Sequence, residues 1–367
     1  MAEAREEHPA ALVELVRRAV PGARLVEVEP LHPDTNDEAA TTKGAGYGVP
    51  LKLVAEEPGG RRRCLVFHTA SPDWFGHDRR ADRATEMLLA YDTFGGIARH
   101  VPALDVGAVT RDGEGLVSLR DAGEFYMVTG WAEGHVYAEE LRRVARTGEA
   151  QALDLAHASE LARYLVELHR DKLDSPPRYV RALRDLLGSG EGIFGIVDGY
   201  PDDVPAAPRS RLRAIEQACL EWRWRLQDET ARLSVMHGDF HPFNVVFDER
   251  EGLAVLDAAR GCAGDPADDV TCMAINYVFF AVAAPHAWRT AFRGLWQRFW
   301  QSYLDESRDR RLLDVAAPFL AWRGLVVANP AWYPAVSADA RDRVLTLIER
   351  TLSAPRFDPA FADEVFR

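Results

Sequence analysis

Apolar and polar positions in the first third of the chain follow two different spacings. Apolar residues in the segment 8–20 recur every three or four positions, as on one buried helix face, and Pro21-Gly22 ends this segment. Short apolar runs predict strands over residues 24–31, 49–55, 63–69, 115–119 and 124–129. A helical spacing returns between residues 79 and 94. Together these elements predict a small antiparallel sheet with one helix.

From residue 137 onward the spacing is helical over most of the chain. Helical stripes of apolar residues cover 155–169, 212–226 and 288–299. Two short apolar runs, 245–247 and 253–256, interrupt the pattern, and the Asp-Glu-Arg-Glu-Gly sequence between them is typical of a hairpin turn. We therefore expect a larger helical part that contains one β-hairpin.

Polar side chains that could bind a metal or take part in catalysis lie at the ends of these predicted strands. His237, Asp239 and Asn244 precede the hairpin, and Asp257 follows it. A short hairpin brings residues on either side of it close together. Two carboxylates and one amide then form a site of hard oxygen ligands, which suits Mg²⁺ and the phosphate groups that Mg²⁺ binds.

The spacing of these residues resembles a known family. His237-Gly238-Asp239 with Asn244 five residues after the Asp looks like the catalytic loop of the aminoglycoside phosphotransferase and choline kinase family. The second block also matches, because Asp257 is followed by Gly264-Asp265-Pro266 and then by Asp269. Members of this family are small-molecule kinases that share the protein-kinase fold.

The resemblance implies an α+β, bilobal protein-kinase-like fold. The N-lobe, residues 1–130, would carry the antiparallel sheet, and the C-lobe, residues 131–367, would carry the catalytic hairpin and the helices. ATP would lie between the two lobes. Its γ-phosphate would pass to a hydroxyl group of a small-molecule acceptor.

Roles for the catalytic residues follow from the same resemblance. Asp257 is expected to chelate Mg²⁺ on the ATP phosphates, and Asn244 to give an amide oxygen to the same or a second ion. Asp239 is expected to orient the acceptor hydroxyl and take its proton. His237 would fix the loop by hydrogen bonding, and His241 would lie near phosphate or metal. Asp265 and Asp269 would cap the next helix and hold the loop after Asp257.

Nucleotide-binding residues are expected at two further places. The polar segment between the first two strands contains Lys43, Gly44 and Gly46, and it resembles the family's nucleotide-positioning loop, where glycines let backbone N–H groups approach phosphates. Gly130 and Trp131 match the hinge in position, where backbone groups bind the adenine edge.

The end of the third strand departs from the family pattern. The family has a Lys or Arg there, which pairs with a Glu on the following helix, whereas this chain has His68 followed by Glu86. His68 would either anchor phosphate beside Glu86 or merely cap the strand, and Lys43 is the best substitute for the missing charge. The missing lysine also suggests an alternative function, that of a pseudokinase or nucleotide-binding regulatory module.

Composition narrows the class of protein further. The net charge of −13 argues against a nucleic-acid partner, because phosphate backbones require a basic face. The longest apolar run, 277–284, is too short to span a membrane, and the four cysteines show no paired spacing, so we expect a cytoplasmic protein. A different hypothesis treats His237, Asp239 and His241 as transition-metal ligands of a hydrolase.

The identity of the acceptor is not set by the motifs. The segment 188–208 is rich in Gly, Pro and Asp, and it would form either a wall of the acceptor pocket or a solvated connection. Its acidic residues would favour a cationic acceptor: Glu191, Asp198, Asp202 and Asp203. Four aromatic residues near Asn329 would either line a substrate site or pack in the core: Phe319, Trp322, Trp332 and Tyr333.

Overall fold

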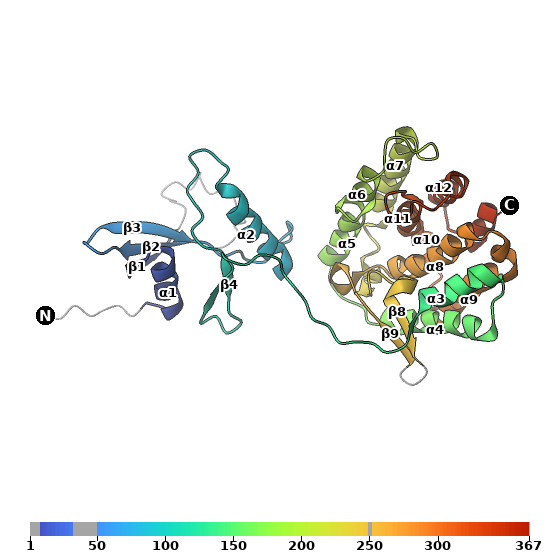
Figure 1. Cartoon of the computed structure of the whole chain (residues 1–367), viewed down its shortest axis with the longest axis horizontal. Helices are drawn as coiled ribbons and strands as arrows, with labels where there is room; N and C mark the ends of the chain where they lie inside the picture. The colour runs from blue at the N-terminus through green and yellow to red at the C-terminus, as the bar shows by residue number, and fades with distance from the viewer. Residues whose placement is uncertain (1–7, 32–49, 249–251, 367) are drawn as a thin grey trace. The chain divides into compact units, whose positions relative to one another are not determined.

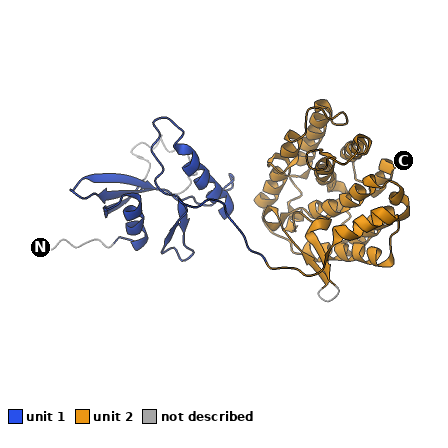
Figure 2. Ribbon diagram, viewed as in Figure 1, with its two compact units in different colours: residues 1–129 blue, residues 130–367 orange. Residues whose placement is uncertain are grey.

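The computed structural model describes residues 8–31, 50–248 and 252–366. The chain divides into two compact units, residues 1–129 and residues 130–367, and each is described by itself (Figure 2). The expected phosphate-binding residues Lys43, Gly44 and Gly46 lie outside the described residues.

Unit 1 is built on a three-stranded antiparallel sheet in the order β1-β2-β3 (Figure 1). These strands are Arg24–Pro30, Leu51–Glu56 and Arg62–Phe67. Helix α1 (Ala10–Ala19) packs its apolar face on this sheet, and the resulting core includes Val16, Leu25 and Leu53. The helical and strand spacings of the sequence predicted these four elements correctly.

The rest of unit 1 differs from the expected single sheet. Helix α2 (Arg80–Phe94) forms as predicted, but β4 (Gly107–Val109) and β5 (Leu116–Ser118) make a separate hairpin. The prediction of a strand over 124–129 is wrong, since that segment has no strand and its apolar side chains from Phe125 to Val128 are exposed. Its composition suits a strand, but a strand also needs a partner for its backbone groups, and no described strand pairs with it.

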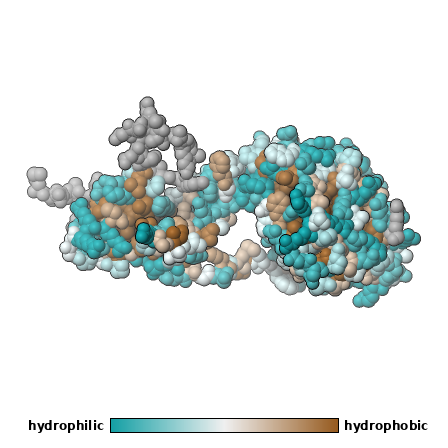
Figure 3. Space-filling model, turned by 90° about the horizontal axis from the view of Figure 1, so that it is seen from above, coloured by the Kyte–Doolittle hydropathy of each residue, from teal (hydrophilic) through white to brown (hydrophobic). Residues whose placement is uncertain are grey.

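Unit 2 is mainly helical. Its helices are α3 (Tyr137–Thr147), α4 (Ala152–Leu168), α5 (Pro176–Gly188), α6 (Ile193–Asp198), α7 (Arg209–Leu226), α8 (Pro266–Ala283), α9 (Arg293–Ser307), α10 (Leu312–Val315), α11 (Ala317–Ala328) and α12 (Ala338–Ser353). Helix α8 is buried along almost its whole length, α4 packs against α9, and α11 packs against α12. None of the helices in the described ranges is long and apolar enough to cross a membrane. On the face seen in Figure 3, hydrophilic side chains cover most of unit 2, with smaller hydrophobic areas between them.

Short strands in unit 2 position the polar loops. The predicted hairpin is formed by β8 (Val245–Asp248) and β9 (Gly252–Val255), and β6 (His135–Val136) pairs with the other edge of β8. In a second pair, β7 (Ser234–Val235) lies against β10 (Ala263–Gly264). The residues just before β8 and just after β9 are therefore held between two small sheets.

The segment 188–208 packs against the C-terminal helices and contains α6. The Tyr200 hydroxyl donates to the Leu325 carbonyl oxygen at 2.6 Å, and the Trp322 indole N–H donates to the Glu191 carbonyl oxygen at 2.8 Å. Trp322 and Phe319 are themselves buried, whereas Trp332 is exposed. These contacts fix the segment to α11, while its acidic side chains, those of Glu191, Asp198, Asp202 and Asp203, stay exposed.

Candidate active site

Asp269 holds the loop that contains Asp239. Its carboxylate accepts hydrogen bonds from the backbone N–H groups of His237 and Gly238, at 2.7 and 2.8 Å, and lies 3.2 Å from Nε2 of His169. Burial alone would raise the pKa of Asp269, but the His169 and backbone donors outweigh it, and the pKa is lowered. We expected Asp269 to hold the loop after Asp257, and its hydrogen bonds go to the Asp239 loop instead.

Asp265 caps helix α8, as the sequence predicted. Its Oδ1 accepts from the Ala267 N–H at 2.9 Å, and both carboxylate oxygens also accept from the Arg232 guanidinium. The Tyr179 hydroxyl donates to the same carboxylate at 2.9 Å. The helix that carries Asp269 thus begins at a fixed, buried point.

Gly238 brings the loops on the two sides of the hairpin into contact. Its φ of +85° lies in the left-handed region, and a Cβ there would lie 2.5 Å from the Ala259 carbonyl oxygen. The Ala259 N–H in turn donates to the His237 carbonyl oxygen at 2.8 Å. Only glycine allows this close approach, which places the segment after Asp257 against the segment that carries Asp239.

Three side chains lie against the Asp239 carboxylate, and the nearest nitrogen of one of them, Arg260, is 3.9 Å away. Oδ1 of Asp239 accepts from Nη1 of Arg323 at 2.8 Å, and its Oδ2 lies 3.4 Å from Nε2 of His241. Burial tends to raise its pKa, but the His241 hydrogen bond and the Arg323 charge have the larger combined effect and lower the pKa well below its usual range. Asp239 therefore remains ionised near neutral pH.

Arg323 is a site residue that the sequence motifs did not reveal. It lies on α11, and its Nη2 donates to the Gly238 carbonyl oxygen at 3.0 Å and to Oδ1 of Asp268 at 2.8 Å. Its guanidinium carbon also lies 3.8 Å from the centre of the Trp322 ring. One signal was present in the sequence, because Arg323 is the only charged residue in an apolar helix, and a buried charge requires a partner.

Asn244 and the residue before Asp257 are joined across the base of the hairpin. The Asn244 carbonyl oxygen accepts from the Leu256 N–H at 2.9 Å, and its side-chain Nδ2 donates to the Asp239 carbonyl oxygen at 3.1 Å. Within the described residues, the Asn244 side-chain oxygen and the exposed Asp257 carboxylate take part in no hydrogen bond or ion pair. The site therefore offers two oxygen ligands that its own fold does not use.

The backbone after β9 is strained. Asp257, Arg260 and Cys262 have φ values of +52°, +54° and +53°, and they are three of the five described non-glycine residues with positive φ. Such residues cost free energy and occur where the surrounding structure fixes a particular side-chain direction. The strain here begins at Asp257, whose carboxylate has no partner in the part of the chain that the structure describes.

The donor set fits a magnesium ion better than a transition metal. Mg²⁺ prefers oxygen ligands and commonly takes one or two from the protein and the rest from water and phosphate, which suits Asn244 and Asp257. Among the described residues no group of three or more His, Cys, Asp or Glu side chains is arranged to hold a metal. His237, Asp239 and His241 do not form such a group, and Nδ1 of His237 accepts from the Asp239 N–H at 3.2 Å. The structure thus gives no support to the hydrolase hypothesis.

The expected pair of His68 and Glu86 does not form. His68 directly follows β3 and is exposed, and in the described ranges it has no ion pair or hydrogen bond. Glu86 lies 3.2 Å from Nε2 of His77, whose Nδ1 is 3.0 Å from Asp73. His77 is closer to Glu86 in sequence than His68 is, so this pair closes the shorter loop. Gly130 and Trp131 are exposed and belong to no helix or strand.

The two units define the class of fold. An antiparallel sheet with helices, followed by a mainly helical unit that carries the Asp239 loop and its hairpin, is the α+β architecture expected from the sequence. A sequence model of the phosphotransferase enzyme family matches residues 59–313, which is more than half of the chain. The chain belongs to this family.

Similar solved structures carry the names of small-molecule kinases. A glucosamine kinase (crystal form A) is 15% identical, with 92% of this chain and 93% of that chain covered and a TM-score of 0.42. An ethanolamine kinase from Plasmodium vivax is 12% identical, with 93% and 81% covered and a TM-score of 0.35. In crystal form B of the glucosamine kinase, at 16% identity and a TM-score of 0.38, 60% of this chain and 56% of that chain are covered. Comparison with curated proteins gave no match.

Proposed function

We propose that the chain is an ATP-dependent phosphotransferase that moves the γ-phosphate of Mg-ATP to a hydroxyl group of a small molecule. One observation carries the proposal beyond family membership. Asp239, Asn244 and the backbone next to Asp257 are joined by hydrogen bonds at 3.1 and 2.9 Å, while the Asn244 and Asp257 side-chain oxygens have no partner among the residues that the structure describes. A fixed carboxylate on a loop joined to two residues with oxygen ligands to offer suits a metal-bound triphosphate and an acceptor hydroxyl.

Asp239 acts on the acceptor. Its carboxylate receives the hydroxyl hydrogen bond and directs the oxygen at the γ-phosphorus in line with the leaving group. The new bond joins the acceptor oxygen to the γ-phosphorus, the bond from that phosphorus to the β–γ bridging oxygen breaks, and ADP leaves. The proton passes to Asp239 and then to water. Because the pKa of Asp239 is lowered, this transfer comes late, and positioning contributes more than basicity.

Asn244 and Asp257 would hold the magnesium ion. When bound, Mg²⁺ neutralises the charge of the triphosphate and stabilises the charge that develops during transfer. The chain's own contribution is to present these two ligands beside Asp239. Gly238 supports that arrangement because it lets the two loops touch.

Nucleotide contacts outside this loop remain part of the proposal. Lys43, Gly44 and Gly46 are assigned to the phosphates, and Gly130 and Trp131 to the adenine. His68 and Glu86 are not paired with each other, so Lys43 is the better candidate for the charge that the family places on the third strand. We also propose a cytoplasmic location, because the spacing of the four cysteines does not suggest disulfides.

Acceptor-dependent release of ADP tests the proposal. The full chain is incubated with Mg-ATP and a panel of hydroxylated metabolites and antibiotics, and ADP is followed by a coupled assay. At least one acceptor should raise ADP formation above the rate with water, and Asp239→Asn should abolish that increase while Mg-ATP binding, measured by calorimetry, persists. Mg-ATP binding without turnover for any acceptor would favour the pseudokinase alternative, and turnover that survives Asp239→Asn would remove Asp239 from its role.

A further inference from the structure

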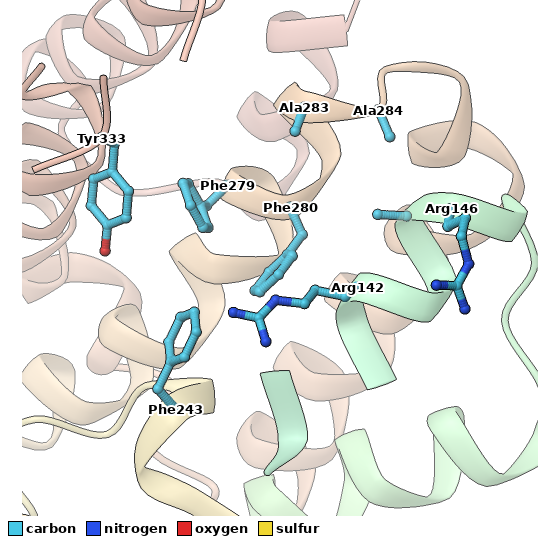
Figure 4. A pocket seen from close by; sticks show the side chains of 9 residues that line it. Arg142, Arg146, Phe243, Phe279, Phe280, Ala283, Ala284 and Tyr333 are labelled. Carbon is cyan, nitrogen blue, oxygen red and sulfur yellow. The ribbon is translucent and has the colours of Figure 1, made fainter. Parts of the chain in front are cut away.

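Unit 2 contains a cavity of about 540 Å³ next to the Asp239 loop. This volume lies within the range of small-molecule sites. Nine residues line the cavity, and they come from α3, the turn before β8, the end of α8 with its following residue, and the segment after α11 (Figure 4). Four distant parts of the sequence therefore build it.

One side of the cavity is a continuous row of aromatic rings. The ring centres of Phe243 and Phe280 are 6.2 Å apart, those of Phe280 and Phe279 are 5.2 Å apart, and those of Phe279 and Tyr333 are 4.7 Å apart. Phe280 is buried, and the other three rings are partly exposed. Such a row binds a flat or apolar molecular body through its faces and edges.

The charges at the cavity are positive. Arg142 and Arg146 lie one turn apart on α3, and none of the nine lining residues is acidic. The Arg142 guanidinium points toward the Phe243 ring, with its central carbon 5.3 Å from the ring centre (Figure 4). In the described part of the chain neither arginine forms an ion pair. The Arg146 side chain extends away from the aromatic rings in Figure 4, so Arg142 is the cation placed to bind a carboxylate, sulfonate or phosphate group in the cavity.

The cavity is connected to the catalytic loop through Phe243. This residue lies between Asp239 and Asn244, its N–H donates to Nδ1 of His241 at 3.2 Å, and His241 is 3.4 Å from the Asp239 carboxylate. At the other end of the aromatic row, Tyr333 has a raised pKa, first through burial and then through Cys272 and Asp239. The cavity therefore takes part of its lining from the loop that carries the residue assigned to the acceptor hydroxyl.

We infer that this cavity is the acceptor site, and that the acceptor is a hydroxylated compound with an aromatic or otherwise apolar body and an anionic group. The inference rests on the proposed function. It replaces our expectation of a cationic acceptor, because none of the acidic residues of the segment 188–208 lines the cavity. An ammonium group would be repelled by the Arg142 guanidinium there, whereas an anion would pair with it.

Two probes that differ only in charge test the preference. One is 4′-(hydroxymethyl)biphenyl-4-carboxylate, and the other carries an aminomethyl group in place of the carboxylate. Their dissociation constants for the full chain are measured by calorimetry without nucleotide. We expect the carboxylate to bind about tenfold more tightly at low salt, with the difference falling as ionic strength rises.

A charge-reversal variant assigns the effect to the cavity. Arg142→Glu should reverse the preference between the two probes, because it replaces a cation at the cavity by an anion. Arg298→Glu, an exposed change of the same charge on α9 outside the cavity, should leave the preference as in the wild type. Both positions are exposed, so neither change removes core packing.

The outcomes separate this inference from the proposed function. Absence of binding, a preference for the aminomethyl probe, a preference that survives Arg142→Glu, or displacement of the carboxylate by Mg-ATP would each overturn the acceptor site inferred here. Added Mg-ATP should instead leave the carboxylate bound and convert its hydroxyl to a phosphate ester with release of ADP. Selective binding without any ADP formation would refute the proposed phosphoryl transfer and leave the cavity as an anion-selective site.

Discussion

Arg323 offers the sharpest test of the electrostatics around Asp239. The change Arg323→Met keeps an unbranched side chain of similar length but removes the guanidinium. Three hydrogen bonds disappear, at 2.8 Å to Asp239, 3.0 Å to the Gly238 carbonyl oxygen and 2.8 Å to Asp268. The stacking on Trp322 loses its cationic part as well.

The size of the effect follows from burial. Asp268 is 5% exposed, and without Arg323 its one remaining ion pair within the described residues is with Arg260, whose nearest nitrogen is 3.4 Å away. The Asp239 side chain is partly exposed and can bind water in place of Arg323, so it contributes less to the loss of stability. Breaking a buried ion pair by removal of one partner typically costs about 3–5 kcal/mol. We expect Arg323→Met to lower the free energy of unfolding by an amount in this range.

Urea denaturation monitored by tryptophan fluorescence measures this loss. Eight of the nine tryptophans lie in unit 2, since Trp74 is the only one in unit 1, so the signal reports mainly on unit 2. Arg311→Met is the matched control. Arg311 pairs with Glu229 at the surface and its side chain is 58% exposed, so its loss should cost less than about 1 kcal/mol.

A second variant separates the buried charge from lost packing. Asp268→Asn in the Arg323→Met background removes the unpaired carboxylate and should restore about 0.5–3 kcal/mol. An Arg323→Met variant as stable as Arg311→Met would refute the reasoning. A double variant no more stable than the single one would also refute it.

Two further predictions concern the loops around Asp239. Gly238→Ala should destabilise unit 2 by about 2–4 kcal/mol, because its φ is +85° and its new Cβ would lie 2.5 Å from the Ala259 carbonyl oxygen. In the control Gly294→Ala, on α9, the new Cβ meets nothing within 4 Å, so this change should stabilise unit 2 by about 0.5–1 kcal/mol. Equal urea midpoints for the two variants would contradict this. The pKa of Asp269 is lower in the folded chain than the unfolded value, so it stabilises the fold above the unfolded pKa and this contribution is lost as pH falls through the folded pKa. Asp269→Asn should therefore cost about 1.5–3 kcal/mol at pH 7 and progressively less below about pH 4, measured as urea midpoints; a cost that does not change with pH would contradict the assignment.

Features encoded within short stretches of sequence could be predicted. The hairpin at 245–256, the helices α4, α7 and α9 and the cap of α8 at Asp265 depend on local spacing and on residue types that prefer those positions. Helix α6 was not predicted, because its segment is rich in Gly, Pro and Asp. The predicted site residues Asp239 and Asn244 lie five positions apart, so one turn brings them together.

Features that join distant parts of the chain could not be predicted. Arg323 reaches Asp239 across 84 residues, and the cavity takes its lining from residues between 142 and 333. The pairing of Glu86 with His77 was likewise hidden, because an ion pair depends on side-chain reach and not on a motif. The strand predicted over 124–129 failed for the same reason, since the sequence of a strand does not specify its partner.

Binding of ATP with and without magnesium tests the central claim most directly. Calorimetry on the full chain compares the binding of ATP in excess Mg²⁺ with its binding in a chelator, for the wild type and for Asp257→Asn. In the wild type the Asp257 carboxylate is exposed and has no partner in the described residues, so its replacement breaks no contact there. We predict that Mg²⁺ lowers the dissociation constant of ATP for the wild type. In Asp257→Asn this magnesium-dependent factor should be at least about tenfold smaller, while the dissociation constant in chelator stays the same. A variant that keeps the full magnesium-dependent gain would contradict the placement of the metal-bound triphosphate at Asn244 and Asp257.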